Sequence, residues 1–123
     1  MKTLCRIRDI YRAISEFETQ FQQMHNLNLN EGMLLCSIHT NGVLTSGEIA
    51  NVLGLTASNT SKVITSTEKK GLVKREFGHS DKRQMYFSLT EKGLTAISEI
   101  ECDKVDVPSM LCSFLNFEEA DLK

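Results

Sequence analysis

The sequence lacks any long apolar run. No stretch approaches the ~18 consecutive apolar residues that a membrane-spanning helix needs. Charged residues at Arg6, Arg8, Asp9 and Arg12 interrupt the N-terminal stretch, so it also lacks the apolar segment of a secretory signal. We therefore expect a cytoplasmic protein without a membrane partner.

Cysteine and histidine are few and lie far apart in the sequence. Among the cysteines there is no CxxC pair and no histidine at ligand spacing, so we predict neither a metal site nor a cofactor. We expect reduced thiols that fill small apolar positions, at Cys5, Cys36, Cys102 and Cys112. No nucleophile paired with a base and no phosphate-binding loop is recognisable. We therefore assign no catalytic residue and do not expect an enzyme.

The composition fits one globular domain with an uneven charge distribution. The 123 residues are 41% hydrophobic and 24% charged, enough for a single core. The formal net charge is −2, yet residues 44–93 hold eight Lys and Arg against five Asp and Glu, a net charge of +3. The two ends hold six against eleven, a net charge of −5. A basic middle between acidic ends is typical of a DNA-reading module on a separate scaffold.

Residues 3–25 are predicted to form one long amphipathic helix. Apolar residues recur at alternating steps of three and four, at Ile7, Ile10, Ile14, Phe17, Phe21 and Met24. Such a seam is longer than a small domain can cover, so we favour a helix shared between two subunits. The alternative is a helix that packs on its own domain.

A second helix is predicted over Glu31–Thr40, with Asn30 as its N-cap. Its apolar positions surround most of the cylinder, which indicates a buried helix. These positions are Met33, Leu34, Leu35, Cys36 and Ile38. A very short strand is expected at Val43 and Leu44.

A helix-turn-helix is predicted between residues 45 and 71. Thr45 and Glu48 have the spacing of a capping box, which begins a helix that runs to Leu53. Thr56 then caps a second helix over Ala57–Lys70. Two short helices joined by a turn that contains glycine form this motif. The predicted inward positions are Ile49, Val52, Leu53, Val63 and Ile64.

A β-hairpin is predicted after the helix-turn-helix, because the apolar period changes to two. Its strands are Leu72–Phe77 and Gln84–Leu89, and the polar, basic segment between them forms the tip. The predicted inward residues are Val73, Phe77, Met85, Phe87 and Leu89. Beyond the hairpin, Thr90 caps a fifth helix from Glu91, and Pro108 suits the first turn of a sixth.

The helix that begins at Ala57 has the properties of a major-groove recognition helix. Such a helix needs short polar side chains near its N-terminus, so that its backbone can approach the base edges. Asn59 is predicted to read adenine and Thr60 to touch a thymine methyl group. Three neighbours are predicted to hold phosphates, namely Ser58, Ser61 and Lys62.

The hairpin tip has the cations that a DNA-binding wing needs. Lys82 and Arg83 can reach phosphates or the minor groove, and an ion pair from Asp81 can fix the Arg83 guanidinium. The full set of predicted DNA-contacting residues is Ser46, Thr56, Ala57, Ser58, Asn59, Thr60, Ser61, Lys62, Lys74, Arg75, His79, Ser80, Asp81, Lys82 and Arg83.

Residues 44–93 resemble the winged-helix core of the MarR family of bacterial regulators. The matching pieces stand in the family's order: LTxxEIA from Leu44, LGLT from Leu53, a Ser-rich helix, EKKGLV from Glu68, Asp81-x-Arg83, and LTEKG from Leu89. The resemblance implies a homodimeric repressor that binds a pseudo-palindromic operator in double-stranded DNA, with recognition helices in successive major grooves and wings at the minor groove. It also implies release by a small-molecule effector or by cysteine oxidation.

The sequence departs from the family pattern at several positions. Thr60 and Thr67 stand where aliphatic residues are common, which predicts looser packing of the recognition helix. Ser66 stands where arginine is common. Cys5 lies in the first helix, like the reactive thiol of the family's hydroperoxide sensors. The tyrosines that bind that thiol have no clear counterpart here, and Asp9, one turn later, disfavours a thiolate.

We therefore predict a mainly α-helical fold with a small β-hairpin, a winged helix-turn-helix with flanking dimerisation helices. Residues 1–123 form a single domain, with the winged core at 30–93 and dimerisation helices at 1–29 and 94–123. The predicted dimer contacts are Ile7, Ile10, Ile14, Phe17, Phe21, Met110, Leu111 and Phe114. The alternatives are a protein-interaction module that has lost DNA binding and a thiol-based redox regulator.

Overall fold

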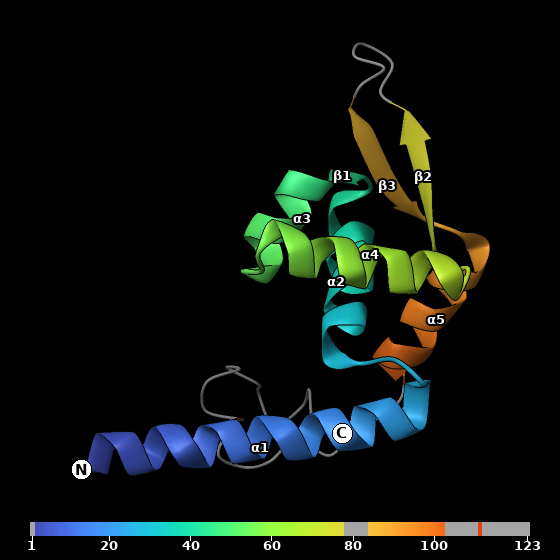
Figure 1. Cartoon of the computed structure of the whole chain (residues 1–123). Helices are drawn as coiled ribbons and strands as arrows, with labels where there is room; N and C mark the ends of the chain where they lie inside the picture. The colour runs from blue at the N-terminus through green and yellow to red at the C-terminus, as the bar shows by residue number, and fades with distance from the viewer. Residues whose placement is uncertain (1, 78–83, 103–110, 112–123) are drawn as a thin grey trace. The chain divides into compact units, whose positions relative to one another are not determined.

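The computed structural model describes residues 2–77, 84–102 and 111, and it confirms the predicted fold class (Figure 1). The elements are α1 (Lys2–His25), α2 (Leu29–Asn41), β1 (Leu44–Thr45), α3 (Ser46–Leu53), α4 (Ala57–Lys69), β2 (Val73–Phe77), β3 (Met85–Leu89) and α5 (Glu91–Cys102). The chain divides into two compact units, residues 1–28 with 103–123, and residues 29–102. The predicted sixth helix, including Met110 and Phe114, lies outside the described residues, except for half-buried Leu111.

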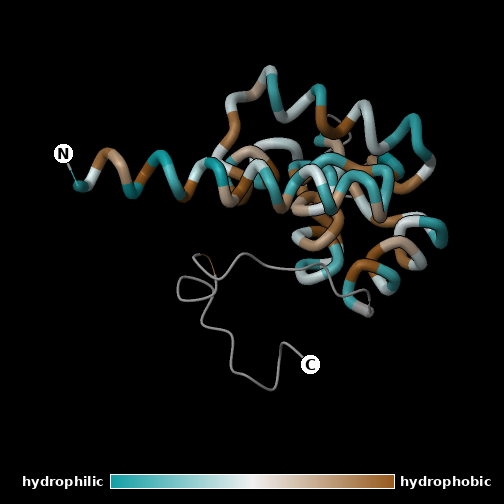
Figure 2. The backbone as a smooth tube through the Cα atoms, turned by 90° about the horizontal axis from the view of Figure 1, so that it is seen from below, coloured by the Kyte–Doolittle hydropathy of each residue, from teal (hydrophilic) through white to brown (hydrophobic). Residues whose placement is uncertain are grey.

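Helix α1 belongs to the first unit, and hydrophobic residues recur along it among hydrophilic ones (Figure 2). Phe21 is buried, and its ring lies 6.1 Å from the Phe17 ring and 4.9 Å from the His25 ring. Ile7 and Ile14 remain 44% and 39% exposed. Much of the seam is therefore still available to a partner.

Helix α2 forms the centre of the second unit. It packs against α3, α4, α5 and β3, and Leu34, Leu35 and Ile38 are fully buried. The prediction that apolar residues are buried all round this helix is wrong, because Met33 and Cys36 are exposed. Cys5 is exposed too, so neither thiol fills an apolar core position as expected. The helix also begins at Leu29, so Asn30 lies within it instead of capping it.

The capping box at the start of α3 is confirmed. The Thr45 hydroxyl accepts a hydrogen bond from the Glu48 amide at 3.2 Å, and Glu48 Oε1 accepts one from the Thr45 amide at 3.0 Å. Ile49 is fully buried, whereas Val52, which was predicted to point inward, is 56% exposed. Strand β1 begins one residue later than predicted and leaves Val43 outside the sheet.

The sheet is antiparallel with the strand order β1-β3-β2. Val73 pairs with Leu89, Arg75 with Phe87, and Phe77 with Met85, so these six residues share one face of the hairpin. Burial on this face is complete at Val73 and Phe87, but Phe77 is 66% exposed. The prediction that Phe77 points into the core is wrong, because the strands extend beyond the helices that cover their other end (Figure 1).

The LTEKG segment connects the start of α5 to the end of α4 through hydrogen bonds. The Thr90 hydroxyl donates to the Gly71 carbonyl at 2.6 Å and accepts from the Gly93 amide at 3.0 Å, which confirms Thr90 as the cap of α5. Lys92 Nζ donates to the Lys70 carbonyl at 2.9 Å. A Cβ on Gly93 would lie 2.2 Å from the Leu72 carbonyl oxygen, so only glycine fits this approach.

Two further features of the described residues bear on function. None of their helices is both long enough and apolar enough to span a membrane. Within the same residues, no three His, Cys, Asp or Glu side chains gather closely enough to hold a metal ion.

Candidate nucleic-acid interface

The N-terminal half of α4 presents a polar surface to solvent. Thr56 is the N-cap, as predicted, and its hydroxyl accepts from the Asn59 amide at 3.1 Å. This cap leaves other N–H groups of the first turn directed outward, with the positive end of the helix dipole. The exposed side chains here are Ala57, Ser58, Asn59, Ser61 and Lys62.

Thr60 does not belong to this surface. It is only 2% exposed, and its hydroxyl donates to the Thr56 carbonyl at 2.7 Å. The predicted contact between Thr60 and a thymine methyl group is therefore corrected to a core position. Thr60 lies between exposed Asn59 and Ser61, but its side chain is on the face that α4 packs against its neighbours.

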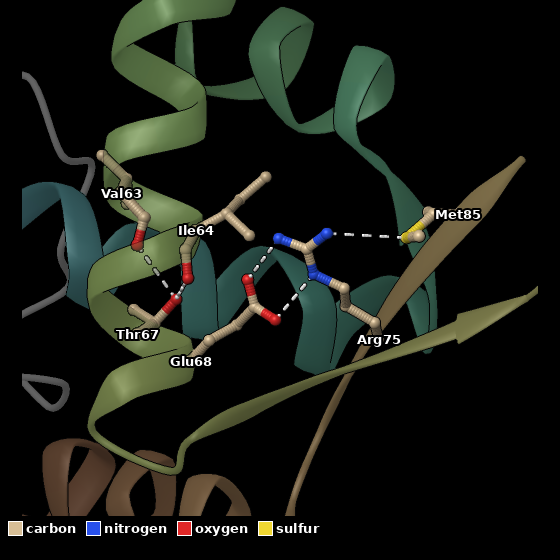
Figure 3. Close-up of polar contacts among 6 residues, drawn as sticks. All are labelled: Val63, Ile64, Thr67, Glu68, Arg75 and Met85. Atoms are coloured by element: carbon tan, nitrogen blue, oxygen red, sulfur yellow. Dashed lines mark hydrogen bonds and ion pairs between the residues drawn. The ribbon is translucent and has the colours of Figure 1, made fainter.

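Thr67 is buried in the same way, further along α4. Its hydroxyl donates to the carbonyl oxygens of Val63 at 3.0 Å and Ile64 at 2.9 Å (Figure 3). Both buried threonines thus satisfy their hydroxyls within their own helix, which removes most of the cost of burying a polar group. The expected loosening of the helix is not needed to accommodate them.

A buried carboxylate joins α2 to the C-terminal half of α4. Glu31 is 1% exposed. Its carboxylate accepts a hydrogen bond from the Ser66 hydroxyl at 2.5 Å and pairs with the Lys70 ammonium at 2.9 Å. Sequence reasoning missed this group, because its partners lie 35 and 39 residues away. The one available signal was the helical spacing of Glu31 from Leu34, Leu35 and Ile38, which places it on the same face as these apolar residues.

Arg75 is engaged within the protein, although we predicted that it contacts DNA. Its guanidinium donates two hydrogen bonds to Glu68 of α4, at 2.8 and 2.9 Å (Figure 3). It also lies 5.6 Å above the Phe87 ring and donates to Met85 Sδ at 3.7 Å. The hydrogen bonds to Glu68, and then its negative charge, raise the pKa of Arg75. Arg75 therefore fixes the hairpin against α4, and its contact with DNA stays a prediction, because its side chain is still 49% exposed.

The remaining predicted DNA contacts divide into two groups. Ser46 is exposed at the start of α3, and Lys74 is exposed on β2, where its ammonium lies 3.6 Å from a Glu76 carboxylate oxygen. The tip residues lie outside the described part of the chain, as does the proposed ion pair within them. These are His79, Ser80, Asp81, Lys82 and Arg83.

Comparison with known proteins gives this arrangement a family context. The model of the MarR family matches residues 27–85. Over 90 residues the chain is 30% identical to the HTH-type transcriptional regulator YkoM of Bacillus subtilis. This alignment covers 73% of this chain and 58% of YkoM. Over 93 residues it is 28% identical to the regulator YwaE of the same organism, covering 76% of this chain and 54% of YwaE. The chain thus spans little more than half the length of these relatives.

The fold is also similar to that of solved regulators. A crystal structure of a MarR variant from E. coli complexed with operator DNA matches with a TM-score of 0.73 and 18% identity. The match covers 98% of this chain and 88% of that one. This similarity identifies the winged-helix fold.

Proposed function

We propose that the chain, whose residues 27–85 match the model of the MarR family, is a sequence-specific DNA-binding transcription regulator of that family. The proposed form is a homodimeric repressor that binds a pseudo-palindromic operator. The recognition helix α4 enters the major groove, and the wing reaches the minor groove.

The exposed polar turn of α4 is the observation that carries this proposal. Short exposed side chains, together with the N-terminus of the helix, suit close approach to base edges and phosphates, and they are Ala57, Ser58, Asn59 and Ser61. Asn59 is exposed and can make the bidentate contact to adenine, while Lys62 supplies a phosphate contact. A MarR variant from E. coli with the same fold has been solved in complex with operator DNA, which supports DNA as the partner.

The dimer is proposed from α1. Exposed Ile7 and Ile14 belong to an apolar seam that water covers in an isolated subunit. We therefore assign the flanking segments 1–29 and 94–123 to dimerisation and the core 30–93 to DNA. A second α4 would then meet the next major groove about one helical turn away. Release by a small-molecule effector remains a prediction of the family resemblance.

Selection of bound sequences from a random double-stranded DNA library tests the proposal directly. The purified full chain should enrich one motif with two inverted half-sites centred about one helical turn apart. The Asn59→Ala variant should lose preference at one base per half-site, while Thr95→Ala, on exposed α5 surface, should enrich the original motif. If no motif is enriched, DNA recognition is excluded and the protein-interaction module becomes the better explanation.

A further inference from the structure

The apolar face of the hairpin continues beyond the core. Val73, Arg75 and Phe77 alternate along this face of β2, opposite Leu89, Phe87 and Met85 of β3. Burial falls toward the far end, from 3% exposure at Val73 to 66% at Phe77, with Met85 half-buried. Phe77 is thus a large aromatic side chain that the second unit leaves uncovered.

The position of Phe77 relative to the recognition helix is fixed. Arg75 stands two residues before Phe77 on the same face, and its guanidinium is held by both oxygens of Glu68 on α4. A bidentate pair of this kind restrains orientation as well as distance. The same guanidinium contacts Met85, the strand partner of Phe77 (Figure 3). The exposed ring therefore lies on the hairpin face that is turned toward α4.

We propose that Phe77, supported by Met85, is an apolar contact for the sugar–phosphate backbone of the duplex that α4 binds. This inference rests on the proposed function and adds a residue to the same interface. A duplex with α4 in its major groove and the wing at its minor groove has one backbone strand running between the two elements. We expect the Phe77 ring to contact the apolar C–H groups of the deoxyribose rings along that strand.

The charges around Phe77 favour this occupant over a protein. Lys74, Arg75 and Glu76 precede it directly, whereas the centre of a protein–protein interface is depleted of charge. A nucleic-acid backbone combines an apolar sugar with a negative phosphate. It therefore suits an isolated aromatic ring beside cations, and exposed Lys62 and Lys69 supply cations on α4. Lys74 and Arg75 are already paired with Glu76 and Glu68.

The salt dependence of binding distinguishes an apolar contact from an ionic one. Binding to the selected operator is measured between low and moderate salt for the full chain and for Phe77→Ala. The variant should bind about tenfold more weakly at each salt concentration, because it loses apolar area but no charge. The slope of log K against log salt should not change. Lys62→Ala should instead reduce that slope by about one.

Matched controls separate the contact from effects on folding. Val43→Ala removes another exposed apolar side chain, beside β1, and should bind like the unmodified chain. Phe77→Leu keeps an apolar side chain and should retain most of the affinity. Phe77→Gln introduces a polar side chain and should reduce the affinity for the operator as much as Phe77→Ala does. Thermal unfolding should be little changed in all of them, since 66% of Phe77 is already exposed.

Three outcomes overturn the inference while leaving the proposed function intact. The first is unchanged affinity in both Phe77→Ala and Phe77→Gln. The second is an affinity loss accompanied by a shallower salt slope, which would mean that displaced cations cause the loss. The third is a change in sedimentation without a change in intrinsic DNA affinity, which would place a second copy of the chain on Phe77. Absence of any selected operator would instead reject the proposed function itself.

Discussion

At the scale of single residues, the described structure places polar groups inside the second unit and satisfies them there. Thr60 and Thr67 donate to carbonyls one turn earlier in the chain, whereas Glu31 of α2 pairs with Ser66 and Lys70 near the end of α4. A carboxylate that is 1% exposed needs such partners, because burying an unpaired charge costs several kcal/mol. Glu31 thereby fixes the C-terminal half of α4 while the N-terminal half stays open to solvent.

We expect Glu31→Gln to lower the free energy of unfolding by about 1–3 kcal/mol, because it removes the charge that pairs with Lys70. The Lys70 side chain is 36% exposed, which keeps the effect below that of a fully buried pair. Urea denaturation of the single variants and of the Glu31→Gln/Lys70→Gln double variant provides the measurement. The decrease in the free energy of unfolding of the double variant should be smaller than the sum of the decreases in the two single variants. Strictly additive effects would mean that the two groups do not interact energetically.

Gly93 offers a second test at this scale. In Gly93→Ala the new methyl group would meet the Leu72 carbonyl oxygen at 2.2 Å, and the backbone would have to move. We expect a loss of about 2–4 kcal/mol in the free energy of unfolding, typical of steric overpacking beside rigid backbone. Gly47→Ala is the control, because nothing lies within 4 Å of its Cβ position. Equal stabilities for the two variants would contradict the close approach of α5 to Leu72.

At the scale of secondary-structure elements, the cap of α3 makes stability depend on pH. Two hydrogen bonds from Thr45 lower the pKa of Glu48 below its usual value of 4.5. The one from the Thr45 backbone has the larger effect, and the one from its hydroxyl the smaller. A carboxyl group whose pKa is lower in the folded state stabilises the fold above its unfolded pKa. That contribution is lost as the pH falls through the lower folded pKa.

Glu48→Gln should therefore be less stable than the unmodified chain at pH 7, and the difference should narrow below pH 4.5. Urea midpoints at several pH values measure this. Glu91→Gln serves as the control, because it removes another exposed first-turn carboxylate, on α5. If the stability difference between Glu48→Gln and the unmodified chain stays constant from pH 7 into the acid range, the charge of Glu48 plays no part in the cap.

Local signals of this kind are why the elements could be predicted from the sequence. The caps at Thr45, Thr56 and Thr90 depend on residues three positions apart, which a single sequence displays. The partner of Arg75 could not be predicted, because its contact with Glu68 depends on how β2 returns across α4. The exposure of Phe77 likewise depends on where the helical cover of the sheet ends, and the alternating pattern does not contain that information.

At the scale of the whole molecule, charge and apolar surface separate along the chain. Residues 44–93 carry a net charge of +3, and the remaining residues carry −5. The basic part contains the helix-turn-helix and the hairpin, while α1, with four Lys and Arg against three Asp and Glu, carries an exposed apolar seam. This separation suits a molecule in which one region meets a polyanion and another meets a second copy of the chain.

The exposed seam of α1 gives the sharpest test of dimerisation at Ile14. Because 39% of Ile14 is exposed in the isolated chain, Ile14→Glu should disturb a subunit interface far more than the folding of one subunit. We expect sedimentation velocity to show a monomer, while circular dichroism shows unchanged helix content. The variant should also bind an operator with two half-sites much more weakly than the unmodified chain does. Gln23→Glu adds the same charge on the opposite side of α1 and should remain dimeric, since a helix turns about 100° per residue. An Ile14→Glu variant that stays dimeric at the same concentration would assign the seam to packing within its own subunit, and the paired half-sites would then need another explanation.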